Sequence, residues 1–112
     1  MEKIRELVFY RHYFNEFYEA QDQRVKVKVD HVLFVLTHAE RIPGKFLKHI
    51  KDQKGLYEIR VDAGSTIFRI FCFFDKGKIV VLLNAFQKKT QKTPKQEIEK
   101  ALKIKIEYYE NK

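Results

Sequence analysis

Cysteine, tryptophan, glycine and proline are scarce in this chain of 112 residues, which contains one, none, four and two of them respectively. The single cysteine excludes an intrachain disulfide and suits a reducing compartment. Cys72 stands between Phe71 and Phe73 in an apolar run. We therefore expect its thiol to be a small core group and not a nucleophile.

Long apolar runs and metal-ligand spacings are missing as well. No stretch approaches the about 20 residues that a membrane-spanning helix needs, and no N-terminal segment has the apolar centre of a signal peptide. His12, His31 and His38 have no local partner typical of a metal site, so we expect no metal and no cofactor. The sequence predicts a soluble cytoplasmic protein with one domain over residues 1–112.

Positive charge, in contrast, is abundant. The net charge is +8 and the isoelectric point is near 9.6. This balance indicates a polyanionic partner, most simply nucleic acid; the alternative is a basic surface that binds nothing in particular. Residues 41–60 carry six basic and two acidic side chains, and residues 86–112 carry eight and four. Two segments therefore hold the excess charge.

The N-terminal part reads as a strand followed by a helix. Ile4–Tyr10 alternates as an edge strand does. After His12 the period changes, because Phe14, Phe17 and Tyr18 recur at helical spacing and predict a short first helix.

Residues 22–41 fit two patterns. Valines alternate with lysines from Val25 to Val29, which favours a strand. A longer series at helical spacing is too long for an ordinary strand; it consists of Val25, Val29, Val32, Leu33 and Leu36. We therefore expect a second helix from about Asp22 to about Arg41, ended by Pro43-Gly44, which forms a helical hairpin with the first.

A basic connection runs from Lys45 to Gly55. Its basic residues are Lys45, Lys48, His49, Lys51 and Lys54. The connection is either a solvated loop or one lip of a phosphate-binding surface.

Three strands follow, at about residues 57–62, 66–74 and 79–86, separated by turns at Gly64 and Gly77. Arg69 stands in the apolar second strand, so it must reach a carboxylate, an open face or a bound anion. Arg60 lies on a polar face, where simple pairing with Glu58 or Asp62 is the alternative to a functional role. The whole pattern predicts an α+β fold: a small antiparallel sheet of about four strands, an N-terminal helical hairpin and a C-terminal helix.

Phe86–Pro94 joins the last strand to the last helix and carries Lys88, Lys89 and Lys92. A loop fixed at both ends can hold cations at defined positions; the alternative is a solvated turn. Thr93-Pro94-Lys95-Gln96 predicts a capping box with Thr93 as the N-cap. The apolar stripe of the following helix is predicted to be Ile98, Leu102, Ile106 and Tyr109.

Three segments, taken together, carry a family resemblance: Gly55–Arg60, Arg69-Ile70 in an aromatic strand, and Phe86–Pro94 followed by Glu97-Ile98 and Ala101. They resemble the phage Gp49-like, HigB-type branch of the RelE toxin superfamily. The resemblance implies a RelE-like fold and a toxin of a type II toxin-antitoxin module. Such a toxin enters the A site of the 70S ribosome and cleaves mRNA, and a HigA-like helix-turn-helix antitoxin binds it.

The resemblance also implies roles for individual residues, with Arg60, Arg69, Lys88 and Lys89 as the catalytic set. Metal-free RNA cleavage needs deprotonation of a 2′-hydroxyl, stabilisation of a phosphorane and protonation of the leaving 5′-oxygen. Arg69 would stabilise the phosphorane with two parallel donors, and Lys89, crowded by Lys88, would move a proton. The remaining cations would bind RNA: Lys45, Lys48, His49, Lys51, Lys54, Lys92 and Lys95.

The general base stays open at this point. The tyrosine that some RelE-type toxins carry after the last basic residue has no counterpart in Thr90–Thr93. The candidates are His49, Glu58 and Tyr57, of which His49 lies among cations that favour a neutral imidazole. The alternative function is a non-catalytic RNA-binding or ribosome-binding protein that uses the same cations.

Overall fold

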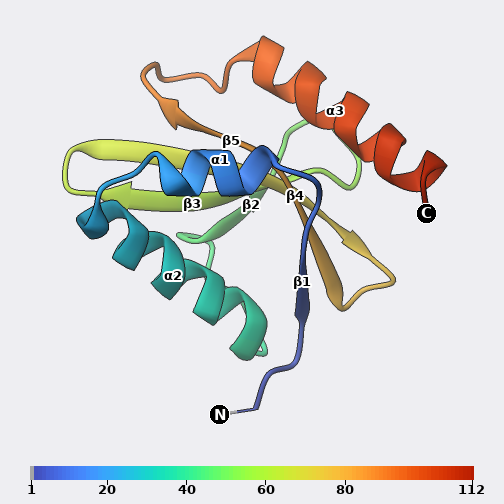
Figure 1. Cartoon of the computed structure of the whole chain (residues 1–112), viewed down its shortest axis with the longest axis horizontal. Coiled ribbons are helices and arrows are strands. Elements are labelled where there is room, and N and C mark those ends of the chain that lie inside the picture. Colours follow the sequence, from blue (N-terminus) through green and yellow to red (C-terminus); the bar gives the residue numbers. More distant parts are fainter. Residues whose placement is uncertain (1) are drawn as a thin grey trace.

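A five-stranded sheet forms the centre of the computed structural model, which describes residues 2–112 (Figure 1). The spatial order of its strands is β1-β5-β4-β3-β2. The strands are β1 (Glu6–Phe9), β2 (Leu47–His49), β3 (Tyr57–Ala63), β4 (Thr66–Asp75) and β5 (Ile79–Lys88). The helices are α1 (Tyr13–Glu19), α2 (Gln23–His38) and α3 (Lys95–Glu110).

The sheet is mixed, so the prediction of about four antiparallel strands is wrong in two respects. First, β1 runs parallel to β5, with Glu6 opposite Ile79 and Phe9 opposite Leu82. Alternation within a strand reveals its faces but not its distant partner, so the parallel pairing had no local signal. Second, β2 lies within the predicted basic connection and pairs antiparallel with β3. Its three residues are too few for a strand pattern to stand out.

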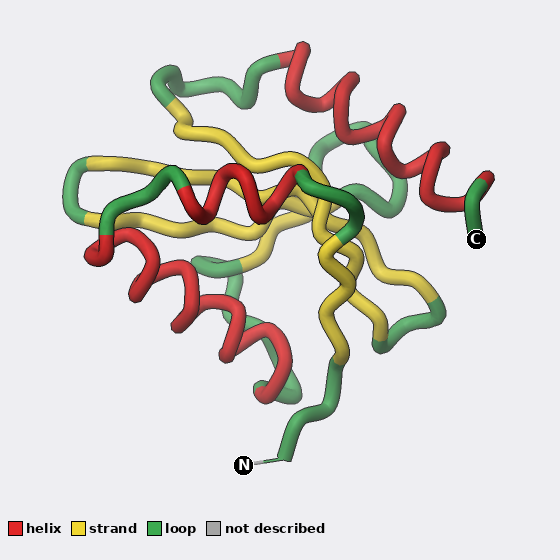
Figure 2. Tube along the Cα trace, viewed as in Figure 1, coloured by secondary structure: helices red, strands yellow, loops and turns green. Residues whose placement is uncertain are grey.

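Helices cover both faces of the sheet, as the tube in Figure 2 shows. On one face α1 and α2 pack against Ile59, Ile70 and Leu82. On the other face α3 packs against Phe71, Phe73 and Leu83. Both N-terminal helices were predicted correctly, but the hairpin was not. The main contacts of α1 are with β5 and those of α2 are with β3, because each helix buries its apolar stripe against the sheet.

The second helix has the N-terminus that its sequence predicts. Asp22 is the N-cap, and its side chain accepts a hydrogen bond from the Val25 amide at 3.0 Å. The helix ends at His38, three residues before the expected Arg41. Arg5 donates to the carbonyl groups of Leu36, Ala39 and Glu40 at this end, so a guanidinium satisfies carbonyl groups that the helix leaves free.

The third helix differs from its prediction at the start. The N-cap is Pro94 and not Thr93, and no side chain caps the helix. Thr93 instead directs its hydroxyl at Glu58 of β3, as described below. The capping-box prediction is therefore wrong, because a tertiary partner takes the hydroxyl that the local motif would have used.

The buried face of α3 also differs from the predicted stripe. Ala101 and Ile104 are its buried residues, whereas Ile106 and Tyr109 are exposed. Ile98 and Leu102, the other two residues of the predicted stripe, are partly buried and pack against the same core cluster as Ala101 and Ile104, so this half of the stripe is confirmed. None of the helices within residues 2–112 combines the length and the apolar character that crossing a bilayer requires.

A β-bulge fixes where α3 begins. Ile70 of β4 pairs with Ala85 and Cys72 pairs with Leu82, so β5 holds one residue more than β4 over this span. The buried Asn84 lies in the bulge and donates to the Glu97 carbonyl at 3.1 Å and to the Glu97 carboxylate at 2.9 Å. The loop between β5 and α3 is thus held from the sheet at the first turn of the helix.

Candidate functional site

Two arginines face each other on neighbouring strands. Arg60 of β3 pairs in register with Arg69 of β4. Arg69 is two residues from Phe71, which packs under α3, so both guanidinium groups lie on the α3 side of the sheet. Like charges directly opposite each other repel, and burial increases the cost. This pair therefore needs an anion between its members.

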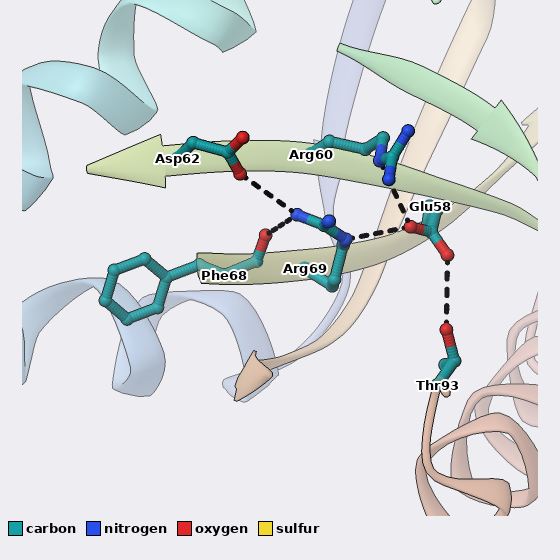
Figure 3. Close-up of polar contacts among 6 residues, drawn as sticks. All are labelled: Glu58, Arg60, Asp62, Phe68, Arg69 and Thr93. Carbon is teal, nitrogen blue, oxygen red and sulfur yellow. Dashed lines mark hydrogen bonds and ion pairs between the residues drawn. The ribbon is translucent and has the colours of Figure 1, made fainter. Parts of the chain in front are cut away.

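Glu58 supplies that anion (Figure 3). Its Oε2 lies 2.8 Å from Nε of Arg69 and 3.5 Å from Nε of Arg60. The Nε–H group of Arg69 is not aligned on this oxygen as a hydrogen bond requires, so the short contact is an ion pair. The carboxylate is buried, with 7% of its side chain exposed. One buried carboxylate thus holds both arginines in place.

Arg69 is almost fully enclosed, with 4% of its side chain exposed, whereas Arg60 retains 31%. Nη1 of Arg69 donates to the Phe68 carbonyl at 2.9 Å and to Oδ1 of Asp62 at 3.3 Å. From its place in an apolar strand, Arg69 was expected to contact a carboxylate, an open face or a bound anion. In the structure it contacts two carboxylates, those of Glu58 and Asp62. Arg60 is the guanidinium of the pair that solvent can reach.

Thr93 ties the lysine-rich loop to this cluster. Its hydroxyl donates to Oε1 of Glu58 at 3.4 Å, a long hydrogen bond that Figure 3 shows at the end of the loop. Farther back in the loop, the hydroxyl of Thr90 donates to the Lys92 carbonyl at 2.8 Å. The loop is consequently anchored to β3 through Thr93 and to β5 through Asn84 and Glu97.

Two adjoining hollows lie along this loop, and we call them together the basic groove. The first has a volume of about 680 Å³ and is lined by both arginines, Lys88 and Lys89. The second has a volume of about 410 Å³ and is lined by Glu58, Lys48, Lys51 and Lys92, among others. Arg60, Lys88 and Gln91 line both hollows. The exposed part of Arg60 therefore lies where the two hollows meet.

The lysines of the groove lack acidic partners. Within residues 2–112, no salt bridge involves Lys48, Lys51, Lys88, Lys89 or Lys92. The two arginines are balanced by Glu58 and Asp62, so the uncompensated positive charge comes from the lysines. A concave surface lined by cations of this kind attracts a polyanion.

Three of the predicted RNA-binding lysines lie outside the groove. Lys45 lines a separate hollow beside α2. Lys54 is exposed in the connection between β2 and β3, and Lys95 is exposed in the first turn of α3. The groove gains Gln87, Gln91 and Thr93, none of which was expected to bind RNA from the sequence. Amide and hydroxyl groups next to lysines were the signal that could have identified them.

Two of the three candidate bases, Tyr57 and Glu58, offer no free proton acceptor to the groove. Tyr57 is one residue from Glu58 in β3, so its side chain lies on the opposite face, where it packs against the α1 and α2 core. His49 pairs in register with Tyr57 and its ring meets the Tyr57 ring at 5.2 Å, although the residue borders the second hollow. Glu58 is occupied by two arginines and Thr93.

Metal-ligating groups do not gather in the described part of the chain. No cluster of three or more histidine, cysteine, aspartate or glutamate side chains occurs within residues 2–112. Cys72 is fully buried, and burial raises the pKa of its thiol far above the ordinary value. A thiol of this kind is a poor nucleophile, so the expectation of a structural Cys72 is confirmed.

Most of the chain matches a known protein family. Residues 16–105 match the family described as phage derived protein Gp49-like (DUF891). No curated protein matches the chain. The matched region includes both arginines, the basic groove and the greater part of α3. It also confirms the resemblance drawn from the residues: the chain belongs to the Gp49-like family of phage-derived proteins, a family of RelE-superfamily toxin-like proteins.

Proposed function

We propose that this protein is the toxin of a type II toxin-antitoxin module and that it cleaves mRNA in the A site of the ribosome. The observation that carries the proposal is the position of Arg60. Its partly exposed guanidinium lies where the two hollows of the basic groove meet, beside Lys88 and in front of the buried Glu58–Arg69 pair. Membership of a toxin-like family supports the same reading.

The groove supplies charge for the transition state. When the 2′-oxygen attacks the adjacent phosphorus, negative charge accumulates on the phosphorane oxygens. Arg60 and Lys88 are the two cations that line both hollows, and we assign them to contact with those oxygens. Arg69 is almost completely enclosed by Glu58 and Asp62. We assign Arg69 a different part from the one expected: it holds the buried Glu58 in place, and Glu58 in turn orients Arg60.

In this proposal Lys89 carries out the proton transfers. The 2′-oxygen forms a bond to phosphorus as the bond from phosphorus to O5′ breaks, leaving a 2′,3′-cyclic phosphate and a 5′-hydroxyl. One proton leaves the 2′-hydroxyl and one reaches O5′, so no other reactant is needed. Lys89 is exposed at the rim of the first hollow and is the group that we assign to proton transfer.

A second candidate function has an observation in its favour. Tyr57 is turned away from the groove, Glu58 is engaged by two arginines, and the ring of His49 lies against that of Tyr57. A protein that only binds RNA or the ribosome needs the cations and no base, and it would have this same arrangement.

The two functions are separated by measuring cleavage and binding on the same variants. For the toxin, Lys89→Ala lowers the rate of mRNA cleavage on translating ribosomes roughly 100-fold or more, the usual effect of losing a proton-transfer group. Its affinity for ribosomes changes only a few-fold. Lys54→Ala is the matched control, because it removes the same charge from an exposed position outside the groove. Binding by the unmodified protein without any cleavage would favour the second function.

The antitoxin partner is tested separately. Expression of the toxin alone should arrest growth, and co-expression of a helix-turn-helix protein from the neighbouring reading frame should restore it. Co-purification of the two proteins should accompany the rescue. Growth that continues when the toxin is expressed alone would contradict the toxin role.

A further inference from the structure

A third hollow, of about 280 Å³, lies beside the basic groove and between α2 and the segment before β2. Lys28 and His31 of α2 line one wall, and Lys45 and Phe46 line the other. Arg60 lines it too, as it lines both hollows of the groove. The mechanism proposed above makes no use of this hollow.

We propose that this hollow is a nucleotide subsite, in which one base of single-stranded RNA stacks on His31 while the adjacent phosphate lies at Arg60. The inference rests on the proposed function, because it takes RNA to be the occupant of the groove. It adds a definite path for the strand, from the lysine-rich loop across Arg60 toward α2.

The strand lengths explain why the hollow exists. β2 begins at Leu47, which pairs with Ile59, and one further hydrogen bond joins the Arg60 amide to the Phe46 carbonyl at 2.8 Å. β3 continues to Ala63 without β2 alongside it. The outer edge of β3 beyond Arg60 therefore faces the hollow and not another strand. Backbone at such an edge is available for contact with a ligand.

Aromatic rings form a corner in this hollow. The rings of His31 and Phe46 are 5.9 Å apart and nearly perpendicular, at 80°. The ammonium group of Lys45 lies 5.0 Å from the centre of the Phe46 ring. The face of Phe46 is therefore already occupied by a cation. His31 is exposed on α2. The imidazole is therefore the ring that can accept a base, as aromatic side chains do in single-strand binding sites.

The charges fit a strand that passes through. Within residues 2–112, neither Lys28 nor Lys45 takes part in a salt bridge, so both ammonium groups can neutralise phosphates. The one carboxylate that lines the hollow is that of Asp62, which is paired with Arg69 through Oδ1. Two cations and an aromatic ring next to a phosphate-binding arginine recognise a nucleotide and not an isolated anion.

The test uses direct RNA binding, which requires neither the ribosome nor cleavage. Affinity for a labelled single-stranded RNA, several nucleotides long, is measured at low salt and pH 8, where an ordinary imidazole is neutral. His31→Ala should weaken binding about tenfold, as expected for a lost stacking contact, and His31→Phe should retain the affinity of the unmodified protein. His38→Ala is the control, because His38 lies on the same helix and stacks on Phe34 instead.

Abasic substitutions in the RNA locate the base. Removal of one particular base should weaken binding to the unmodified protein and have no further effect on His31→Ala. If His31→Ala binds as His38→Ala does while Arg60→Ala weakens binding, the subsite is wrong and the groove proposal survives. If neither His31→Ala nor Arg60→Ala changes the affinity, both proposals fail.

Discussion

Arg60 and Arg69 lie directly opposite each other on β3 and β4, and the same oxygen of Glu58 lies within 3.5 Å of both. The two residues have different surroundings. Arg69 is enclosed by carboxylates, whereas Arg60 opens onto the groove. One arginine thus serves the stability of the sheet and the other is free for a ligand, and this division leads to measurable consequences.

Loss of Glu58 should destabilise the protein strongly. Glu58→Ala leaves two opposed guanidinium groups with no anion between them, and one of them is buried. Breaking a buried ion pair in this way costs about 3–5 kcal/mol. Urea unfolding measures the change, with the exposed Glu99→Ala as a control that should stay within about 0.5 kcal/mol. Equal effects from the two substitutions would show that Glu58 does not organise the cluster.

Substitutions of the two arginines should differ in their effects on stability and on RNA affinity. Arg69→Ala leaves Glu58 buried beside a cavity and should lower the free energy of unfolding by about 3 kcal/mol or more. Arg60→Ala removes a partly exposed member and should cost about 1 kcal/mol or less. The same Arg60→Ala protein should lose RNA affinity. Comparable losses of stability from both variants would contradict the division of roles.

RNA affinity should depend steeply on salt, because the lysines of the groove lack acidic partners. Each phosphate that is neutralised on single-stranded RNA contributes about 0.7 to the slope of log affinity against log salt. Lys88→Ala should therefore reduce the slope by about that amount, and Lys54→Ala should leave it unchanged. The measurement is a titration of labelled RNA at several salt concentrations. A slope that Lys88→Ala does not alter would exclude Lys88 from phosphate binding.

Alkaline pH should weaken the contact between α3 and the sheet, because Tyr108 of α3 donates a hydrogen bond to Asp75 of β4. Burial and a hydrogen bond to Asp75, 2.8 Å long, raise the pKa of Tyr108 to about 12 from its ordinary 10.0. The folded protein thus keeps this proton more tightly than the unfolded chain does. The corresponding stability is fully present below pH 10 and is lost as the pH rises through about 12.

Tyr108→Phe tests this pH dependence. The tyrosinate absorbance of the unmodified protein should contain a component that titrates near pH 12, and this component should be missing from the variant. Urea unfolding at pH 8 and at pH 12 should show the difference in stability between the two proteins shrinking at the higher pH. An absorbance titration that is the same for both proteins near pH 12 would contradict the assignment.

The sequence predicted the elements that have strong local patterns and missed the relationships between distant ones. Alternation in β3 correctly separated Ile59 and Val61 from Glu58 and Arg60, and helical spacing correctly identified α2 despite its valines. Nothing local indicates that β1 lies parallel to β5. The hydroxyl of Thr93 was assigned to a cap because its tertiary partner, Glu58, is 35 residues away.

The candidate site was predicted to a similar extent. The cations of the groove could be named from their residue types, since arginines and lysines next to a fixed loop indicate anion binding. Burial separates Arg60, which a ligand can reach, from Arg69, which it cannot. Lys45, Lys54 and Lys95 are all exposed, but their positions in the fold leave them outside the groove. Glu58 contacts both arginines only because of the register between β3 and β4, which the sequence alone does not determine.

The most direct test of the central claim is to analyse the ends of mRNA after incubating the purified protein with programmed ribosomes. We predict cleavage in the A site without added metal, with a 2′,3′-cyclic phosphate on one fragment and a 5′-hydroxyl on the other. Arg60→Ala should reduce the cleavage rate roughly 100-fold or more, as the loss of a group that stabilises the phosphorane does. Intact mRNA after incubation with the unmodified, folded protein would contradict the account.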